Sequence, residues 1–109
     1  MAQLYSKNIF IENNAKKELF KFPKLVRHSF DELFGELSSL GSLPYPESRK
    51  LSGYDLFELR VRLNGVYRCI YYYKKDYIVI LSAFKKKTQK TPLREIQKAV
   101  KRRTKINLY

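Results

Sequence analysis

The sequence predicts an α+β fold, and two kinds of periodicity carry this prediction. Apolar and polar side chains alternate through much of residues 54–84, a period of two that is typical of β-strands. Before and after this segment, apolar residues recur at steps of three and four, as on one face of a helix. With 109 residues, 44% of them apolar, the chain is predicted to form a single domain over residues 1–109 with a modest core.

The first half of the chain is predicted to hold one strand and two helices. Residues 8–12 resemble a short strand, and the two asparagines that follow are candidate caps for a helix over residues 15–22. A second helix is predicted from Pro23 to Gly41, a residue type that commonly ends helices. Its packing stripe would consist of Leu25, Val26, Phe30, Leu33, Phe34, Leu37 and Leu40. Residues 42–53 contain two prolines and show no period, which predicts a surface loop.

The second half is predicted to hold three strands and a last helix. The strands span about residues 54–63, 66–74 and 76–84, and the third is almost continuously apolar, as in a strand buried on both faces. Thr91 and Pro92 mark a helix start, with the proline at the first helical position. The packing stripe of this helix would be Leu93, Ile96, Ala99 and Val100. The predicted order is βααβββα, with helices packed against a curved, mainly antiparallel sheet.

The charge balance narrows the class of partner. The chain has 23 lysines and arginines against 10 acidic residues, a net charge of +13. Residues 85–105 contribute ten basic residues and the single acid Glu95, so the positive charge is concentrated towards the C-terminus. This balance favours RNA, DNA, an acidic protein or an anionic membrane surface as partner.

Cysteine count and hydropathy point to a soluble cytoplasmic protein. Cys69 is the only cysteine, which excludes an intramolecular disulfide and a cysteine-based zinc site and fits a reducing cytosol. The N-terminal residues lack the apolar core of a signal peptide, and the longest strongly apolar run, residues 77–81, is too short to span a bilayer. We therefore expect no membrane association, no metal site and no small-molecule cofactor.

Arginines are predicted to gather on one face of the central hairpin. Because the apolar residues around them share the opposite face, Arg60 and Arg62 lie side by side, and the turn at Asn64–Gly65 returns the chain so that Arg68 joins them. Planar guanidinium groups on a rigid scaffold suit phosphate oxygens, which makes nucleic acid the first candidate partner. From the pattern alone, a solvated sheet face is the simpler explanation for Arg60 and Arg62, and a solubility or edge-protection cluster explains Lys85–Lys87 equally well.

Three short sequence motifs in this region, used below as landmarks, indicate the protein family that the chain resembles. They are Leu56–Arg60 (LFELR), Gly65–Arg68 (GVYR) and Phe84–Thr88 (FKKKT), the last followed by a helix that starts at Thr-Pro. Together, and over almost the whole chain, they resemble the RelE/HigB superfamily, specifically its phage-derived HigB-like branch. The members of that superfamily are toxins of type II toxin-antitoxin systems, small basic endoribonucleases that cut mRNA in the ribosomal A site. The resemblance implies a RelE-like fold, mRNA on the ribosome as substrate, and a cognate helix-turn-helix antitoxin of the HigA-like kind.

The resemblance also implies roles for individual residues. Metal-independent RNA cleavage needs a proton acceptor for the attacking 2′-hydroxyl, cations for the phosphorane and an acid for the leaving oxygen. Arg68 matches the phosphate-stabilising arginine of the family, and Arg60 matches the basic position on the preceding strand. Lys86, or one of its neighbours, matches the basic position after the last strand. RNA-binding roles are predicted for Arg62, Lys85, Lys87, Lys90 and Tyr72.

The general base remains unassigned at this stage. RelE-type members carry a tyrosine in the final helix, but the aligned position here is about Ile96, which cannot transfer a proton. Glu58, Tyr72, a lysine with a lowered pKa and the terminal Tyr109 are the open candidates. His28 has a suitable intrinsic pKa but is expected on the surface of the second helix, far in sequence from the landmarks.

Two other functions stay open beside the endoribonuclease. A ParE-like gyrase-inhibiting toxin would share the fold without the nuclease residues. A non-catalytic nucleic-acid-binding module would explain the charge alone. The tyrosine run at residues 71–73 could stack on RNA bases, although packing within the protein is the simpler interpretation.

Overall fold

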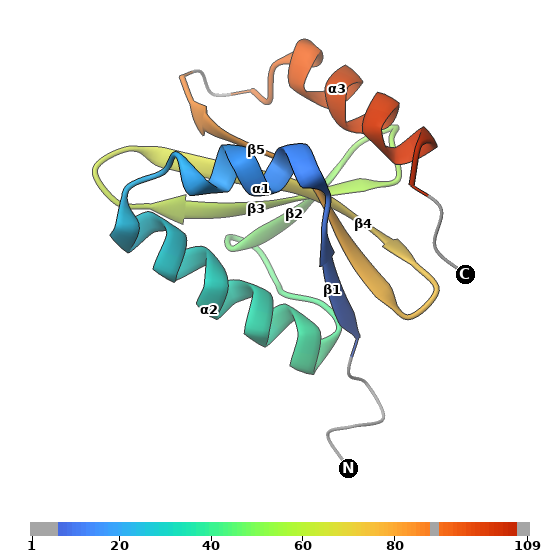
Figure 1. Cartoon of the computed structure of the whole chain (residues 1–109), viewed down its shortest axis with the longest axis horizontal. Coiled ribbons are helices and arrows are strands. Elements are labelled where there is room, and N and C mark those ends of the chain that lie inside the picture. The colour runs from blue at the N-terminus through green and yellow to red at the C-terminus, as the bar shows by residue number, and fades with distance from the viewer. Residues whose placement is uncertain (1–6, 88–89, 107–109) are drawn as a thin grey trace.

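The computed structural model describes residues 7–87 and 90–106, which form a five-stranded mixed sheet and three helices (Figure 1). The elements in chain order are β1 (Asn8–Ile11), α1 (Asn13–Phe20), α2 (Lys24–Leu40), β2 (Ser48–Leu51), β3 (Leu56–Arg62), β4 (Val66–Lys74), β5 (Tyr77–Lys86) and α3 (Leu93–Thr104). The strand order is β1-β5-β4-β3-β2, in which β1 runs parallel to β5 and every other pair is antiparallel. The predicted α+β class with a mainly antiparallel sheet is confirmed.

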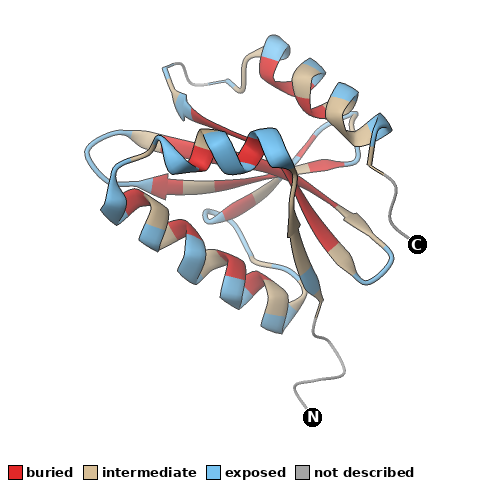
Figure 2. Ribbon diagram, in the orientation of Figure 1, coloured by how far each residue is buried: buried red, intermediate tan, exposed pale blue. Residues whose placement is uncertain are grey.

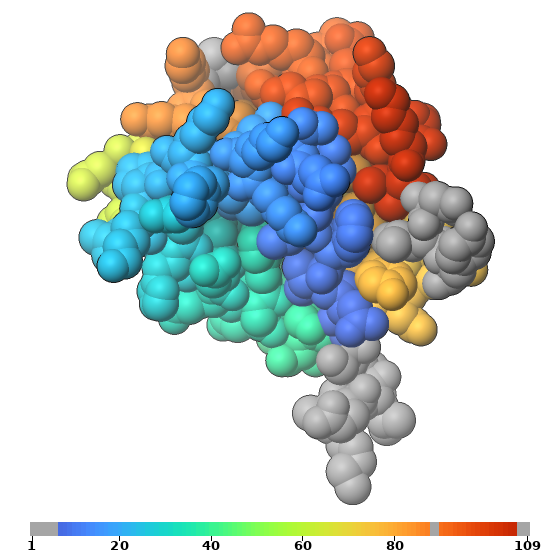
Figure 3. Space-filling model, viewed as in Figure 1, coloured from blue at the N-terminus to red at the C-terminus, as the bar shows by residue number. Residues whose placement is uncertain are grey.

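The helices cover both faces of the sheet. The helices α1 and α2 lie over one face, which is the side turned to the viewer in Figure 3. There, Phe30 and Leu37 of α2 belong to one core cluster with Leu59 and Ile80 of the strands. The helix α3 packs on the other face, where Ile96 belongs to a second cluster built on β3, β4 and β5. Figure 2 shows the resulting pattern, with buried stripes along the helices and continuous burial along the inner strands.

The predicted loop over residues 42–53 is wrong in part, because it contains the edge strand β2. This strand pairs antiparallel with β3, so the order of elements is βααββββα. Its four residues are too few for a sequence period to be recognised, and it is a strand because it pairs with β3. Ser48 at its start is buried and shares a hydrogen bond of 2.5 Å with the hydroxyl of Tyr71 on β4.

Several helix ends also differ from the prediction. The cap of α1 is Glu12, whose carboxylate accepts a hydrogen bond of 2.9 Å from the amide of Ala15, while both asparagines lie inside the helix. Gly41 does end α2, with a φ of 82°. Pro92 is the N-cap of α3 rather than its first helical residue. The ends of the predicted apolar stripes are exposed, namely Leu25, Leu40 and Leu93.

An ion pair holds α1 and α3 together at the edge of β5. Arg102 of α3 donates hydrogen bonds of 2.8 and 3.0 Å to Glu18 of α1 and a third, of 2.9 Å, to the carbonyl of Leu81. The backbone amide of Ala83 donates to the same Glu18. Partial burial opposes ionisation of Glu18, but the hydrogen bonds from Arg102 and Ala83 outweigh it and lower the pKa of the carboxyl. This pair joins α3 to α1 and to the backbone of β5.

None of the helices in the described part of the chain has the length and apolar character needed to cross a membrane.

Candidate functional site

A cationic cleft of about 580 Å³ opens at the end of the β3–β4 hairpin. Its lining residues are Tyr45, Arg49, Arg60, Arg62, Val66, Lys86 and Lys87. They come from the loop before β2, from β2 itself, from the three neighbouring strands β3, β4 and β5, and from the segment after β5. Because five of the seven are arginine or lysine and no acidic residue is among them, the cleft is suited to a negatively charged ligand.

Strand register places these cations on one face. Arg60 pairs with Arg68 across β3 and β4, and Val66 pairs with both Arg62 and Lys86. Residues directly opposite one another in a sheet point to the same side, so Arg60, Arg62 and Lys86 all project towards the α3 side of the sheet. The structure thus brings together three of the residues that the sequence predicted to act on RNA.

Arg68 lies under the cleft instead of lining it. Its side chain is fully buried and donates hydrogen bonds of 2.8 Å to Glu58 on β3 and 2.9 Å to the hydroxyl of Thr91. Thr91 in turn donates to the same carboxylate oxygen of Glu58. Burial lowers the pKa of the Arg68 guanidinium, and the charge and hydrogen bond of Glu58 act against that shift. In this arrangement Arg68 has no exposed surface, and the direct phosphate contact that the resemblance implied stays a prediction.

The buried pair of Glu58 and Arg68 reduces repulsion between neighbouring arginines. Like charges directly opposite each other on neighbouring strands repel, and Arg60 faces Arg68 in this way. Glu58 lies beside both, fully buried, and its second carboxylate oxygen is 3.6 Å from Nε of Arg49. The carboxylate therefore offsets the charge of Arg68 and part of that of Arg49, while Arg60 and Arg62 line the cleft.

Arg60 is the cation best placed to bind an anion. Within the described residues, its Nε and Nη2 atoms are buried and have no hydrogen-bond partner. Buried polar atoms are nearly always paired in folded proteins, so unsatisfied donors at the wall of a cleft indicate a site for an acceptor from outside. Because these two nitrogens have almost no accessible surface, a small movement of the Arg60 side chain in the cleft is needed before the oxygens of a phosphate can accept from both.

The lysines after β5 divide between the two faces. Lys86 lines the cleft, and desolvation, together with the charges of Arg68 and Arg60, lowers the pKa of its ammonium group. Lys85 points to the opposite face, where its Nζ lies 5.5 Å from the ring centroid of Tyr67. Lys87 lines the cleft, whereas Lys90, an exposed residue before α3, is not among the lining residues.

Two of the residues considered as bases, Tyr72 and His28, lie away from the cleft. Tyr72 is buried beneath α3 with Arg103 over its ring, and it lies six residues along β4 from Val66, about 20 Å at the usual rise of a strand. Its predicted contact with RNA therefore does not fit this cleft. Ile96 is part of the core, and Tyr109 lies outside the described residues. His28 is exposed on α2, 3.9 Å from Glu32, so the expected surface position is confirmed.

Tyr45 is a lining residue that the sequence did not single out. It lies between two prolines in the segment expected to be a plain loop, and its ring centroid is 5.1 Å from the guanidinium carbon of Arg60. A hydrogen bond with Arg60 and the charge of the same arginine, with smaller effects of Arg49 and Arg62, lower the pKa of its hydroxyl. An exposed aromatic residue held between prolines was the only signal in the sequence that could have drawn attention to it.

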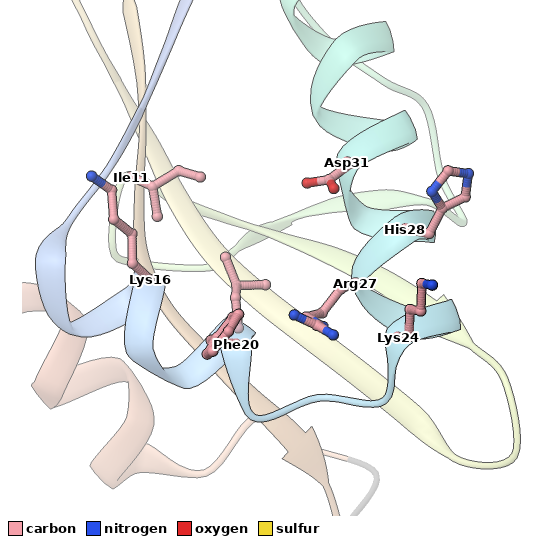
Figure 4. A pocket seen from close by; sticks show the side chains of 8 residues that line it. Ile11, Lys16, Phe20, Lys24, Arg27, His28 and Asp31 are labelled. Carbon is pink, nitrogen blue, oxygen red and sulfur yellow. The ribbon is translucent and has the colours of Figure 1, made fainter.

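A second hollow lies between α1 and α2 and contains none of the predicted catalytic residues (Figure 4). Leu19 and Phe20 supply apolar surface, and the guanidinium of Arg27 lies 4.9 Å from the Phe20 ring centroid. Figure 4 shows His28 and Asp31 on the α2 side of this hollow and Lys16 on the α1 side. No cluster of three or more histidines, cysteines, aspartates or glutamates that could hold a metal ion occurs in the described parts of the chain.

Comparison with known proteins identifies the family of the chain and proteins that share its fold. The model of the family described as phage derived protein Gp49-like matches residues 17–104. No curated protein matches the chain.

Solved structures of RelE toxins superpose on the chain. A mutant of the Escherichia coli toxin RelE in the free state matches with a TM-score of 0.71 and 21% identity, over 89% of this chain and 97% of that one. The Mycobacterium tuberculosis toxin-antitoxin complex RelBE2 matches with a TM-score of 0.58 and 22% identity, over 76% and 94% of the two chains. The RelB-RelE antitoxin-toxin complex of Methanococcus jannaschii matches with a TM-score of 0.58 and 18% identity, over 70% and 88%. The predicted RelE-like fold is confirmed.

Proposed function

Because the chain belongs to the phage-derived Gp49-like family and has the fold of RelE toxins, we propose that it is the toxin of a type II toxin-antitoxin system. We further propose that it inhibits translation as a metal-independent endoribonuclease that cuts mRNA on the ribosome. The observation that carries this proposal is the cleft in which Arg60, Arg62 and Lys86 converge, with unsatisfied donors on Arg60.

The cleft supplies two of the three groups that RNA cleavage requires. When the 2′-hydroxyl attacks the adjacent phosphorus, negative charge builds on the phosphate oxygens, and the guanidinium groups of Arg60 and Arg62, which line the cleft, would stabilise it. Lys86, whose pKa is lowered, can donate a proton to the departing 5′-oxygen. Arg68 acts as a positioning residue in this scheme, because its pair with Glu58 holds β3 and β4 in register beneath the reacting phosphate.

Charge would drive the binding of RNA, and the ribosome would orient the message in the cleft. A net charge of +13 attracts the RNA backbone through release of its counterions, so affinity should fall as salt rises. Holding the message so that the 2′-hydroxyl is in line with the scissile bond can contribute a large part of the rate enhancement without any further protein group.

The proposed partner is a cognate antitoxin. Two of the similar solved structures are complexes of a RelE toxin with its RelB antitoxin, and an acidic segment of such a protein would be complementary to the cleft. A HigA-like helix-turn-helix antitoxin, membership of the HigB-like branch, a cytoplasmic location and a single domain over residues 1–109 remain predictions of the sequence.

Brief induction of the protein in growing cells, followed by mapping of mRNA 5′ ends, tests the proposal. We expect new ends within translated frames, and we expect Arg60→Ala to abolish them with an unchanged melting temperature. Lys50→Ala is the matched control, because Lys50 is an exposed cation on the neighbouring strand β2 that is absent from the cleft.

Other outcomes would replace the proposal with one of its rivals. Growth arrest with intact mRNA and DNA-damage signalling would indicate a ParE-like inhibitor of gyrase. Salt-dependent RNA binding without cleavage on translating ribosomes would indicate a non-catalytic binding module.

A further inference from the structure

We propose that Tyr45 is the general base of the cleavage reaction and that its phenolate oxygen removes the proton of the attacking 2′-hydroxyl. This inference rests on the proposed function, since it names the group that accepts the proton in the same cleft. In RelE-type proteins a tyrosine of the final helix is the candidate base, and this chain has Ile96 at that position. The proposal gives the same role to a tyrosine in the loop before β2.

The position of Tyr45 is determined by the fold. The loop that carries it is tied to the sheet, because the amide of Ser48 donates to the carbonyl of Pro44 at 3.1 Å. The amide of Arg60 donates to the carbonyl of Glu47 at 2.9 Å, which fixes the same loop against β3. The ring of Tyr45 is consequently held beside the guanidinium of Arg60 at 5.1 Å, while 70% of the residue stays accessible to a ligand.

The contact with Arg60 joins the proposed base to the proposed phosphate site. A phosphate bound at Arg60 would lie beside Tyr45, because both residues line the same cleft and are in contact with each other. A base must come within hydrogen-bonding distance of the proton that it removes, and the ribose next to a phosphate at Arg60 would lie on the Tyr45 side of the cleft.

The electrostatic environment supports the role. Arg60, Arg49 and Arg62 all stabilise the ionised form of the phenol, and together they lower its pKa. A phenol whose pKa moves towards neutrality has a larger ionised fraction at pH 7 and is a more effective proton acceptor under those conditions.

The other proton acceptors of the described cleft are already committed. The Glu58 carboxylate is buried and bound to Arg68 and Thr91. Lys86 carries a positive charge that suits a proton donor, and Val66 has no titratable group. Tyr45 is therefore the group among the lining residues that combines an accessible oxygen with an environment that favours its ionised form.

The step balances in protons and electrons. The phenolate of Tyr45 takes the 2′-hydroxyl proton while the 2′-oxygen forms its bond to phosphorus. The bond between phosphorus and the 5′-oxygen breaks, and the leaving oxygen takes a proton from the Lys86 ammonium. The products are a 2′,3′-cyclic phosphate and a 5′-hydroxyl end, and exchange with water restores the phenolate and the ammonium.

Single-turnover cleavage of mRNA on programmed ribosomes, measured across pH, tests this assignment. Tyr45→Phe keeps the ring and its contact with Arg60 but removes the oxygen, so we expect the rate to fall by about 10²- to 10⁴-fold while ribosome binding and melting temperature are unchanged. The rise of the wild-type rate with pH should disappear in this variant. Tyr54→Phe is the matched control, because it removes a hydroxyl in the turn after β2, outside the cleft, and should leave the profile intact.

Incorporation of a fluorinated tyrosine at position 45 provides an independent measurement. Fluorine lowers the pKa of a phenol, so the rising limb of the profile should move to lower pH. A Tyr45→Phe variant that keeps its rate within about threefold and retains the rising limb would overturn the assignment, while the proposed nuclease would stand. Failure of the wild-type protein to cut mRNA would instead overturn the proposed function and this inference with it.

Discussion

The buried pair of Glu58 and Arg68 provides the sharpest test of how this site is held together. Both side chains have no exposed surface, and the two atoms that join them are 2.8 Å apart. Glu58→Gln keeps the size of the side chain but removes the negative charge that pairs with the buried guanidinium of Arg68. Breaking a buried pair in this way costs about 3–5 kcal/mol of the free energy of unfolding, against a typical total of about 5–15 kcal/mol. The melting temperature should therefore fall by at least about 12 °C.

A double substitution separates charge from packing. Replacing both partners with methionine removes the two charges together, and such exchanges are commonly neutral or stabilising. The double variant should thus be markedly more stable than Glu58→Gln, despite the hydrogen bonds that Thr91 loses. Thermal and urea unfolding followed by circular dichroism measure both variants, and Glu32→Gln, in an exposed pair with His28, should behave as wild type. The electrostatic explanation would be refuted if Glu58→Gln lowered the free energy of unfolding by less than about 1 kcal/mol. It would also be refuted if the double variant were no more stable than Glu58→Gln.

Three further outcomes are expected. Lys86→Ala should slow cleavage far more than Lys85→Ala in a ribosome assay, because the two neighbours project to opposite faces of the sheet. Arg62→Ala should reduce the slope of log affinity for single-stranded RNA against log salt by about 0.7, the value for one lost phosphate contact. The Glu18 carboxyl has a lowered pKa in the folded state, so its stabilisation is present above the ordinary value of about 4.3 and is lost as pH falls below it. Arg102→Ala should remove that pH dependence from equilibrium unfolding curves.

The sequence by itself determined the main elements of the fold. Alternation placed Arg60 and Arg62 on one strand face, and the Asn64–Gly65 turn set a hairpin in which Arg68 returns opposite Arg60. These are local properties, because a period of two and a turn with positive φ depend on neighbouring residues alone. The edge strand β2 escaped detection because its four residues form a strand only through pairing with β3.

Only the tertiary structure decided what each member of the candidate site can do. The sequence predicted catalytic roles for both Arg60 and Arg68, but Arg68 is buried in contact with Glu58 and Thr91, while Arg60 lies at the wall of the cleft. Tyr45 could not be assigned from its neighbours in the chain, since its environment comes from arginines on β2 and β3. Burial and charge pairing depend on residues distant in sequence, and for that reason they emerge only when the strands and α3 are assembled.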